Sequence, residues 1–528
     1  MCRHYTFIKS RSGETVPALV LPSGESLPLH SMVDPVREAQ RLVSTIPGDT
    51  GFVALLGLGG GFTAQAVLDK TQAQVLVIDF NNEGINELLC AKDYSKLLNN
   101  ERFCFLSNPS RDEIKNFILE NYRPSLCGGI KTIPLRTRTE ADVLLFETAA
   151  EAIQEAIEII SSDYSVQVHF GKRWFSNIIR NIKNIQDETE NSTANEFPCT
   201  VSEAAVIAAG PSLNQQLPVL TEYKARQVFV ICSDTALPVL LQNDIEPDTV
   251  VSIDCQHISY YHFLVCKKSK LQNIPLVLDI ASPPLLSRFS SSPLYFSGGH
   301  PLAQYISSNW RPFLNLDTSG GNVTHACLSL AQRLGAQRIT LFGADFSYVN
   351  SRTYARGTYI YPYFEKRQNR FTALESLLSA FLYRSPFLPK ESEGQNYRET
   401  ALLRFYRKKL EEKAAKTAAR IYCARGQGAP IKLENKTPQI NENTADAFHI
   451  TGKPKISGTD FLEQYRNDIA ALNSVYLRES GVKNRQILNT LLPAAAAIKH
   501  RNPNLKTEEI IEKTKCFCIS RIDNALNG

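Results

Sequence analysis

The feature that most constrains this chain is a series of short apolar runs, each followed by glycine, serine or an acidic residue. Continuous apolar runs of this kind are typical of strands that are buried on both faces of a parallel sheet. Parallel strands need long crossover connections, and the segments between the runs are long enough to hold helices. The pattern therefore predicts an α/β fold for residues 201–395. The runs are Ala205–Ala208, Val228–Cys232, Val250–Ile253, Leu276–Leu278 and Ile339–Phe342.

A smaller unit of the same kind precedes this region. Residues 52–60 form an apolar run that ends in glycines, and a helix-like stretch follows. A second apolar run, Val75–Asp79, is closed by an acidic residue that lies 20 positions after Gly59. This order of strand, glycine turn, helix and strand resembles a dinucleotide-binding unit. We therefore expect a first α/β domain over residues 1–165.

Helical and polar segments complete the organisation. Apolar residues at helical spacing extend to residue 186, and a polar, unpatterned stretch follows, so we interpret residues 166–200 as a helical connector and linker. Residues 396–528 return to helical patterning, with a polar loop segment near 426–458. The first helix there, 401–416, carries many lysines and arginines, which suit either a solvated face or an acidic partner.

Composition narrows the class of protein. The 58 Lys and Arg against 53 Asp and Glu give a net charge of +5, which permits an anionic ligand without indicating a nucleic-acid binder. The first ten residues lack the apolar segment of a signal peptide, and no apolar stretch is long enough to span a bilayer. The 12 cysteines are scattered and include no CxxC motif, and several lie inside apolar runs, a distribution typical of buried cysteines that stay reduced. We expect a cytoplasmic protein without a membrane or nucleic-acid partner.

The glycine turn of the first unit is a candidate ligand site. Gly57, Gly59 and Gly60 let backbone N–H groups approach a phosphate, and Asp79 is placed to accept hydrogen bonds from a ribose. A nucleotide or S-adenosylmethionine would fit such a turn. The alternative is a tight turn in a scaffold domain that binds no ligand.

The second candidate combines three strand ends of the larger unit. Gly210, Pro211 and Ser212 follow the first strand and offer a sharp turn, a helix start and a hydroxyl group. Because ligands of open parallel sheets bind beyond the carboxyl ends of the strands, we expect the polar residues there to converge. These residues are Asp234, Thr235, Asp254 and Gln256. For Asp234, capping the N-terminus of a helix is the alternative role.

The third candidate is a glycine turn before a helix. Ser319, Gly320, Gly321 and Asn322 form another turn suited to an anion, and Asp345 ends a strand that follows it. Tyrosine hydroxyls downstream are able to hydrogen-bond a departing phosphate, although most of these side chains are expected to pack between elements. They are Tyr348, Tyr354, Tyr359, Tyr361 and Tyr363.

These motifs together carry a family resemblance. The segments IAAGPSL, SDTALPVLLQNDIEPDTVVSID, TSGGNVTHACLSLAQRLGAQRITLFGADFSY and TYARG resemble the central domain of the Maf family of motility-associated flagellin glycosyltransferases. Archaeal pterin diphosphokinases share that domain. The GPS, TSG and DF elements also resemble bacterial sialyltransferases that use CMP-activated nonulosonic acids. The likeness covers most of the chain and implies a Rossmann-like, sialyltransferase-like central domain followed by a helical C-terminal region.

The resemblance implies roles for individual residues. The Gly210–Ser212 turn matches the one that faces the phosphate, while Ser319 and Gly320 match a donor-binding turn. Tyr348 and Tyr354 match the two tyrosines that bind the leaving phosphate, if one inserted residue is allowed. Two departures are that Asp234 and Thr235 replace amide side chains, and that no histidine lies between His325 and His449 to serve as the general base. The base therefore stays open.

The function implied is protein O-glycosylation. An inverting enzyme would move a nonulosonic acid from its CMP donor to Ser or Thr of flagellin, as needed for flagellar assembly and motility. The nucleotide sugar is a substrate, no resident cofactor is firmly implied, and Mg²⁺ at the strand-ending aspartates stays an alternative. The alternatives are a pterin diphosphokinase that uses ATP, methyl transfer by the first unit, and a non-catalytic flagellin-binding protein. The sugar, the modified flagellin residues and the oligomeric state stay open.

Overall fold

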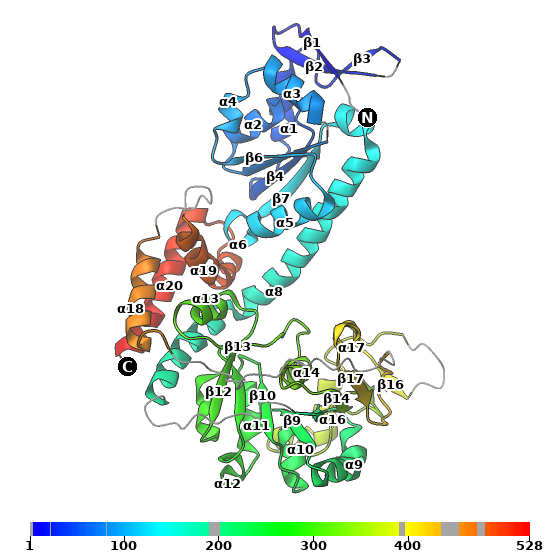
Figure 1. Cartoon of the computed structure of the whole chain (residues 1–528), viewed down its shortest axis with the longest axis vertical. Coiled ribbons are helices and arrows are strands. Elements are labelled where there is room, and N and C mark those ends of the chain that lie inside the picture. Colours follow the sequence, from blue (N-terminus) through cyan, green and yellow to red (C-terminus); the bar gives the residue numbers. More distant parts are fainter. Residues whose placement is uncertain are drawn as a thin grey trace. The chain divides into compact units, whose positions relative to one another are not determined.

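The computed structural model describes residues 4–21, 23–80, 82–188, 201–389, 396–433, 454–472 and 481–527. The chain forms two compact units, of which unit 1 comprises Met1–Lys172 with Asn467–Ile519, and unit 2 comprises Arg173–Arg466 with Ser520–Gly528 (Figure 1). Most of the expected linker, from 189 to 200, and most of the polar loop, from 434 to 453, lie outside the described residues. Among the helices in the described ranges, none is long and apolar enough to cross a membrane.

Unit 1 is built on a parallel sheet with the strand order β6-β5-β4-β7. The residues of β4 point alternately to two apolar clusters: Val53 and Leu55 to one, Phe52 and Ala54 to the other. Burial on both faces explains why this strand reads as a continuous apolar run. The strands are β4 (Thr50–Leu56), β5 (Gln74–Asp79), β6 (Phe103–Ser107) and β7 (Gly129–Pro134), with an antiparallel sheet of β1 (Tyr5–Lys9), β2 (Thr15–Val20) and β3 (Ser26–Pro28).

Helices from both ends of the sequence belong to unit 1. Those in the first part are α1 (Pro35–Val43), α2 (Phe62–Lys70), α3 (Asn82–Ala91), α4 (Ser95–Leu98), α5 (Arg111–Asn121), α6 (Pro124–Cys127) and α7 (Arg136–Ala141). The long helix α8 (Val143–Glu188) contributes residues to both units, as do α18 (Gly458–Ala470) and α20 (Thr507–Asn527). Helix α19 (Val482–Arg501) lies in unit 1, where a Cβ on Gly171 of α8 would collide with the Pro493 carbonyl group. The two helices therefore touch backbone to backbone at this glycine.

Unit 2 contains an eight-stranded sheet, ordered β13-β12-β11-β10-β9-β8-β14-β17, in which every pair of neighbours is parallel. The α/β class with parallel sheets that the sequence predicts is confirmed. The strands are β8 (Glu203–Ile207), β9 (Phe229–Ser233), β10 (Thr249–Ser252), β11 (Leu276–Asp279), β12 (Pro293–Ser297), β13 (Leu314–Asn315), β14 (Arg338–Phe342) and β17 (Arg420–Cys423).

Helices α14 (Val323–Arg333) and α17 (Ala401–Lys416) pack on one face of this sheet. Ala326, Leu330 and Leu410 share an apolar cluster with strand residues such as Val206 and Val251. The other elements are α9 (Leu213–Ala225), α10 (Leu237–Gln242), α11 (Ile258–Leu264), α12 (Lys268–Leu271), η1 (Pro284–Phe289), α13 (Pro301–Asn309), α15 (Ile360–Glu365), α16 (Leu374–Leu382) and the pair β15 (Tyr348–Val349) and β16 (Tyr397–Arg398).

The order of the strands indicates where on the sheet of unit 2 a ligand is expected to bind. From β8 the chain adds strands outward on one side as far as β13, and then returns to add β14 and β17 on the other side of β8. The reversal makes the β8–β14 junction a topological switch point, which is the place where open parallel sheets usually bind their ligands. The polar strand ends of unit 2 therefore share one edge of the sheet.

Candidate active site

The turn after β8 is tied to the turn after β14. Gly210 N–H donates to the Gly343 carbonyl oxygen at 2.9 Å, and Ser212 N–H donates to Asp345 Oδ2 at 2.8 Å. A Cβ on Gly210 would collide with both Gly343 and Asp345, so this close approach requires glycine. Burial raises the pKa of Asp345, while the hydrogen bonds from Ser212 act in the opposite direction.

The segment after β17 covers this junction. Gln427 N–H donates to Ser212 Oγ at 3.0 Å, and Ala429 N–H donates to the Asp345 carbonyl oxygen at 2.9 Å. Ser212 and Asp345 are only 2% and 5% exposed. The groups of Gly210 and Ser212 that the sequence assigned to a phosphate are thus engaged by the protein itself, and here they hold the edge of the sheet together. Pro211 lies between them.

The aspartates after β9 and β10 lie next to each other at this edge. Asp234 accepts hydrogen bonds from Thr235 N–H at 2.7 Å and from Ser252 Oγ at 2.6 Å. Asp254 accepts one from Gln256 N–H at 2.9 Å. Burial raises the pKa of Asp254, and the charge of Asp234 adds to that rise. The structure therefore brings together the four polar residues that the sequence placed on these two strand ends.

The predicted tyrosines join these aspartates. The loop that carries them is fixed to the turn after β8, because Ala355 N–H donates to the Ala209 carbonyl oxygen at 2.9 Å. Burial raises the pKa of Tyr354; the nearby cation Arg384 opposes this shift, whereas Tyr348 and Asp234 reinforce it. The hydroxyl of Tyr354 is therefore protonated at neutral pH and able to donate a hydrogen bond.

Two residues that the sequence did not single out belong to the same cluster. The His262 ring on α11 packs edge-on against Tyr359, with 4.4 Å between ring centroids, and its Nδ1 has no hydrogen-bond partner within the described part of the chain. Burial lowers the pKa of His262, so the imidazole is neutral at pH 7. Arg384, which acts on Tyr354 and Tyr359, supplies a positive charge. Neither residue lies in a recognisable motif.

A third strand end carries an unneutralised carboxyl group. Asp279 closes β11, is 8% exposed and accepts a hydrogen bond from Ala281 N–H at 2.8 Å. Burial raises its pKa to about 7. Among the described residues, no three carboxylate, histidine or cysteine side chains gather closely enough to hold a metal ion.

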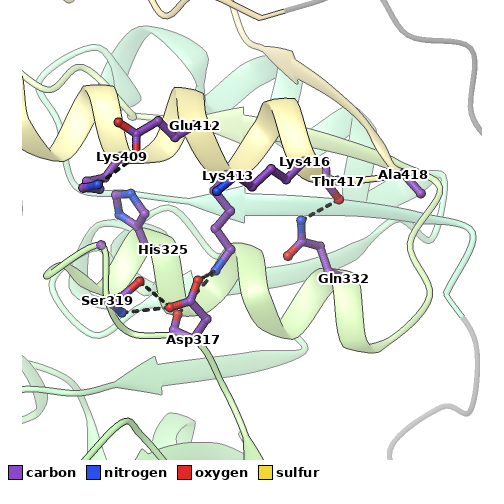
Figure 2. Close-up of a pocket in the computed structure, with 11 residues that line it drawn as sticks. Asp317, Ser319, His325, Gln332, Lys409, Glu412, Lys413, Lys416, Thr417 and Ala418 are labelled. Carbon is purple, nitrogen blue, oxygen red and sulfur yellow. Dashed lines mark hydrogen bonds and ion pairs between the residues drawn. The ribbon is translucent and has the colours of Figure 1, made fainter. Parts of the chain in front are cut away.

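The third predicted turn opens onto a groove of about 490 Å³ between α14 and α17 (Figure 2). Ser319 donates to Asp317 Oδ1 through its N–H at 3.0 Å and through Oγ at 2.6 Å. Lys413 of α17 reaches across the groove to Asp317 Oδ2 at 2.9 Å. Although burial acts against it, hydrogen bonds from Ser319 and Lys413 lower the pKa of Asp317 to about 2.

A buried histidine lies at the floor of this groove. His325 is 1% exposed, and neither ring nitrogen has a hydrogen-bond partner among the residues that the structure describes. Burial, assisted by the charge of Lys413, lowers its pKa to about 4. Gly320 packs directly on this ring, since a Cβ there would collide with it. Asn322 Oδ1 caps α14 by accepting a hydrogen bond from His325 N–H at 3.2 Å.

Tyr406 of α17 links the groove to the aspartates. Its ring lies over Gly321, whose φ of +74° favours glycine, and a Cβ there would come within 2.8 Å of the ring. Burial raises the pKa of Tyr406, and the charge of Asp254 adds to the rise. The TSG turn, the two aspartates and the tyrosine loop thus surround one region at the carboxyl edge of the sheet.

The glycine turn of unit 1 is arranged differently. Leu58 N–H donates to Asp79 Oδ2 at 2.9 Å, and Gly60 N–H donates to His30 Nε2 at 2.8 Å. Gly57 N–H donates to a carbonyl oxygen of β5, and Gly59 packs on the His30 ring. Asp79 pairs with Arg138 at 2.9 Å, and both side chains are fully buried. Because the protein engages these groups itself, we assign no ligand to this turn.

Three comparisons place the chain among known proteins. Residues 176–351 match the family described as 6-hydroxymethylpterin diphosphokinase MptE-like. Two uncharacterized proteins of Treponema pallidum (strain Nichols) are 33% identical over 144 residues and 31% identical over 168 residues. These matches cover 26% and 32% of this chain, and 51% and 78% of the relatives, so the chain spans about half the length of the first.

A solved structure, that of the MAf glycosyltransferase from Magnetospirillum magneticum AMB-1, matches with a TM-score of 0.54. The match covers 99% of this chain and 91% of the other at 13% identity, a level at which the likeness concerns the fold. The resemblance predicted from the sequence, a Maf-like chain around a pterin-kinase-like central segment, is confirmed by these two findings.

Proposed function

We propose that this chain, which belongs to the same family as an uncharacterized protein of Treponema pallidum and has the fold of a Maf glycosyltransferase, is itself a glycosyltransferase. The observation that carries the proposal is a cluster of tyrosines and one arginine near Asp234 at the carboxyl edge of the central sheet. The Tyr354 ring and the Arg384 guanidinium both contact the Phe381 ring, at 6.4 Å and 3.9 Å from its centroid, and Tyr359 packs against His262. This cluster provides hydroxyl donors and a positive charge where an α/β sheet binds its ligands.

The donor we propose is a CMP-activated nonulosonic acid. Its departing phosphate needs hydrogen-bond donors and positive charge, which Tyr348, Tyr354 and Arg384 would supply. Tyrosines with a raised pKa stay protonated and donate, so they suit an anionic leaving group better than ionised ones. Mg²⁺ is a further means of stabilising the phosphate, and the aspartates Asp234 and Asp254 are the residues we would test for it.

The sugar carboxylate is assigned to the TSG turn. Ser319 and Gly320 stand before the N-terminus of α14, and Lys413 adds a positive charge to the groove there. Asp317 is the partner of Ser319 and Lys413 in the structure, and we propose that the sugar carboxylate takes its place on this turn and on Lys413, while the tyrosine cluster binds the phosphate of the same donor.

The chemistry would be an inverting displacement. The bond between the anomeric carbon and the phosphate oxygen breaks, CMP leaves with that electron pair, and the acceptor hydroxyl oxygen bonds to the carbon from the opposite face. The anomeric carbon is tertiary, so its positive character develops early, and positioning and charge stabilisation contribute most of the catalysis. For the hydroxyl proton we propose His262 as acceptor, since it is neutral and lies against Tyr359.

The acceptor we propose is Ser or Thr of flagellin, and the role is in flagellar assembly and motility. Supporting this, the MptE-like match covers residues 176–351 of 528, so most of the chain lies outside the part resembling a small-molecule kinase. A macromolecular acceptor needs a docking surface as well as a pocket.

A donor-release assay tests the proposal. Purified protein is incubated with CMP-activated nonulosonic acid, with and without flagellin, and both free CMP and the mass of flagellin are measured. The proposal predicts flagellin-dependent CMP release with one sugar mass added per CMP. No flagellin modification by the wild-type protein across the available CMP-nonulosonates would contradict it.

Pyrophosphate transfer is the second candidate function, because the matched family at residues 176–351 is described by it. In that case ATP and 6-hydroxymethylpterin would give AMP and the pterin diphosphate, and CMP donors would be inert. Running the two substrate pairs side by side separates the activities.

A further inference from the structure

Unit 1 contains a cavity of its own, and none of the proposed transferase residues lines it. Its volume is about 530 Å³, which is within the range of small-molecule sites. Side chains from the end of α5, from α6, from the middle of α8 and from α19 line it. The lining includes Leu119, Arg123, Asp163, Tyr164, Arg485 and Leu492.

Arg123 is the unusual member of this lining. It is 9% exposed, and its Nη1 has no hydrogen-bond partner among the described residues. Burial, together with the neighbouring cation Arg485, lowers the pKa of Arg123 to about 10, so the guanidinium is still charged at pH 7. Cys127 is the one group that favours its charge, but burial raises the pKa of that thiol to about 11, which leaves it neutral.

Among the residues that the structure describes, no carboxylate neutralises this buried charge. The cavity holds Glu120 and Asp163, yet neither acts on Arg123, and burial alone raises the pKa of Asp163. Buried charges in proteins are normally paired, because an unpaired one loses its hydration without compensation. Arg123 therefore contributes a largely desolvated guanidinium to the cavity lining, and Arg485 contributes a second one.

We propose that this cavity is a binding site for a small organic anion, whose carboxylate or phosphate group is held by Arg123 and Arg485. Two guanidiniums suit such a group, since each offers planar N–H donors to its oxygens. The apolar side chains Leu119 and Leu492 would contact the body of the ligand, and Tyr164 and Asp163 would hydrogen-bond its polar substituents. This site is independent of the proposed transferase activity.

The test is calorimetric titration of the full-length protein with phenyl phosphate, benzoate and the neutral analogue benzyl alcohol. We expect at least one of the two anions to bind, and the neutral analogue not to; the anion that binds more tightly identifies phosphate or carboxylate as the recognised group. Arg123→Met and Arg485→Met should each weaken binding by about tenfold or more. The control Arg111→Met, an exposed arginine of α5, should leave the affinity unchanged.

A stability measurement separates a binding role from a structural one. Because Arg123→Met removes an unpaired buried charge, its melting temperature without ligand should equal or exceed that of the wild type. The proposal is overturned if neither anion binds the wild type, if both arginine variants keep its affinity, or if benzyl alcohol binds as well as the anions. Should Arg123→Met fold poorly, Arg485→Met at an exposed position decides the binding question.

Discussion

Two aspartates close buried parallel strands in the two units, and their surroundings differ. Asp79 at the end of β5 is fully buried and pairs with Arg138, while it also accepts hydrogen bonds from Leu58 N–H and Phe80 N–H. Asp279 at the end of β11 is almost as buried and accepts a hydrogen bond from Ala281 N–H, but no lysine or arginine of the described segments pairs with it. Its pKa therefore rises to about 7.

The glycine turns of the two units differ in the same way. In unit 1, His30 and Asp79 accept the N–H groups of the turn, so its local chemistry is internally balanced. In unit 2, Asp317 likewise accepts the Ser319 N–H group of the TSG turn, but the groove beside that turn holds a buried histidine, His325, whose ring nitrogens have no hydrogen-bond partner within the described ranges. The difference teaches that the same order of strand, turn and helix can serve two purposes. Where every polar group near the turn has a partner within the protein, the turn is part of a scaffold; where buried polar groups lack one, the turn is a candidate ligand site.

The largest expected effect comes from breaking the matched pair of unit 1. Asp79→Ala removes the fully buried partner of Arg138, which keeps only its ion pair with Asp142, and it leaves Leu58 N–H without its acceptor. We expect a loss of about 3 kcal/mol in the free energy of unfolding of that unit. Urea unfolding followed by circular dichroism measures it. Asp69→Ala on the exposed face of α2 is the control and should change stability little. A loss below about 1 kcal/mol for Asp79→Ala would mean that the pair does not hold the turn.

The next largest effect is expected for the tyrosine cluster of unit 2. Tyr354→Phe removes a hydroxyl assigned to the departing phosphate, and we expect kcat for CMP release to fall about 100-fold with unchanged unfolding. Tyr383→Phe, an exposed tyrosine of the same unit, serves as control. Equal rates for Tyr354→Phe and wild type would remove this residue from the chemistry.

The unpaired carboxyl group of Asp279 should make unit 2 sensitive to pH. Its pKa in the folded protein is raised above the unfolded value, so the folded state holds the proton more tightly, and stability falls as pH rises towards 7. Between pH 5 and pH 7 we expect a decrease of about 2 kcal/mol, from 1.36 kcal/mol per pH unit. Asp279→Asn should abolish most of this slope, whereas Asp244→Asn at an exposed position should keep it. A wild-type protein whose stability is flat over this range would contradict the assignment.

The smallest effect is predicted for the groove. Lys413→Met removes the cation that pairs with Asp317, and we expect KM for the donor to rise about tenfold with kcat little changed. Lys408→Met, on an exposed position of the same helix, tests whether general positive charge suffices. If both variants raised KM equally, the groove would attract the donor through its overall charge, not through Lys413 itself.

Local sequence patterns located five strands of the central sheet but not β12, β13 and β17, which lie at or next to its edges, and they gave no information on which side chains become partners. The runs at Ala205–Ala208 and Val228–Cys232 lie within two residues of β8 and β9, because burial on both faces leaves a continuous apolar signal. Strand β17 (Arg420–Cys423) was not predicted from the sequence, because it is short, lies at the edge of the sheet and carries an arginine. That Arg138 reaches Asp79 and that Arg384 lies near Tyr354 are tertiary facts, because no local pattern relates residues so far apart in the chain.

The transfer of a sugar to flagellin by unit 2 is our central proposal, and the intact mass of flagellin tests it most directly. Flagellin is compared from cells with the gene, without it, and complemented with the Tyr354→Phe variant. The account predicts that deletion removes whole sugar units, that the wild-type gene restores them, and that the variant does not, although it is present at wild-type amounts. An unchanged flagellin mass in the deleted strain would contradict the claim and shift attention to pyrophosphate transfer.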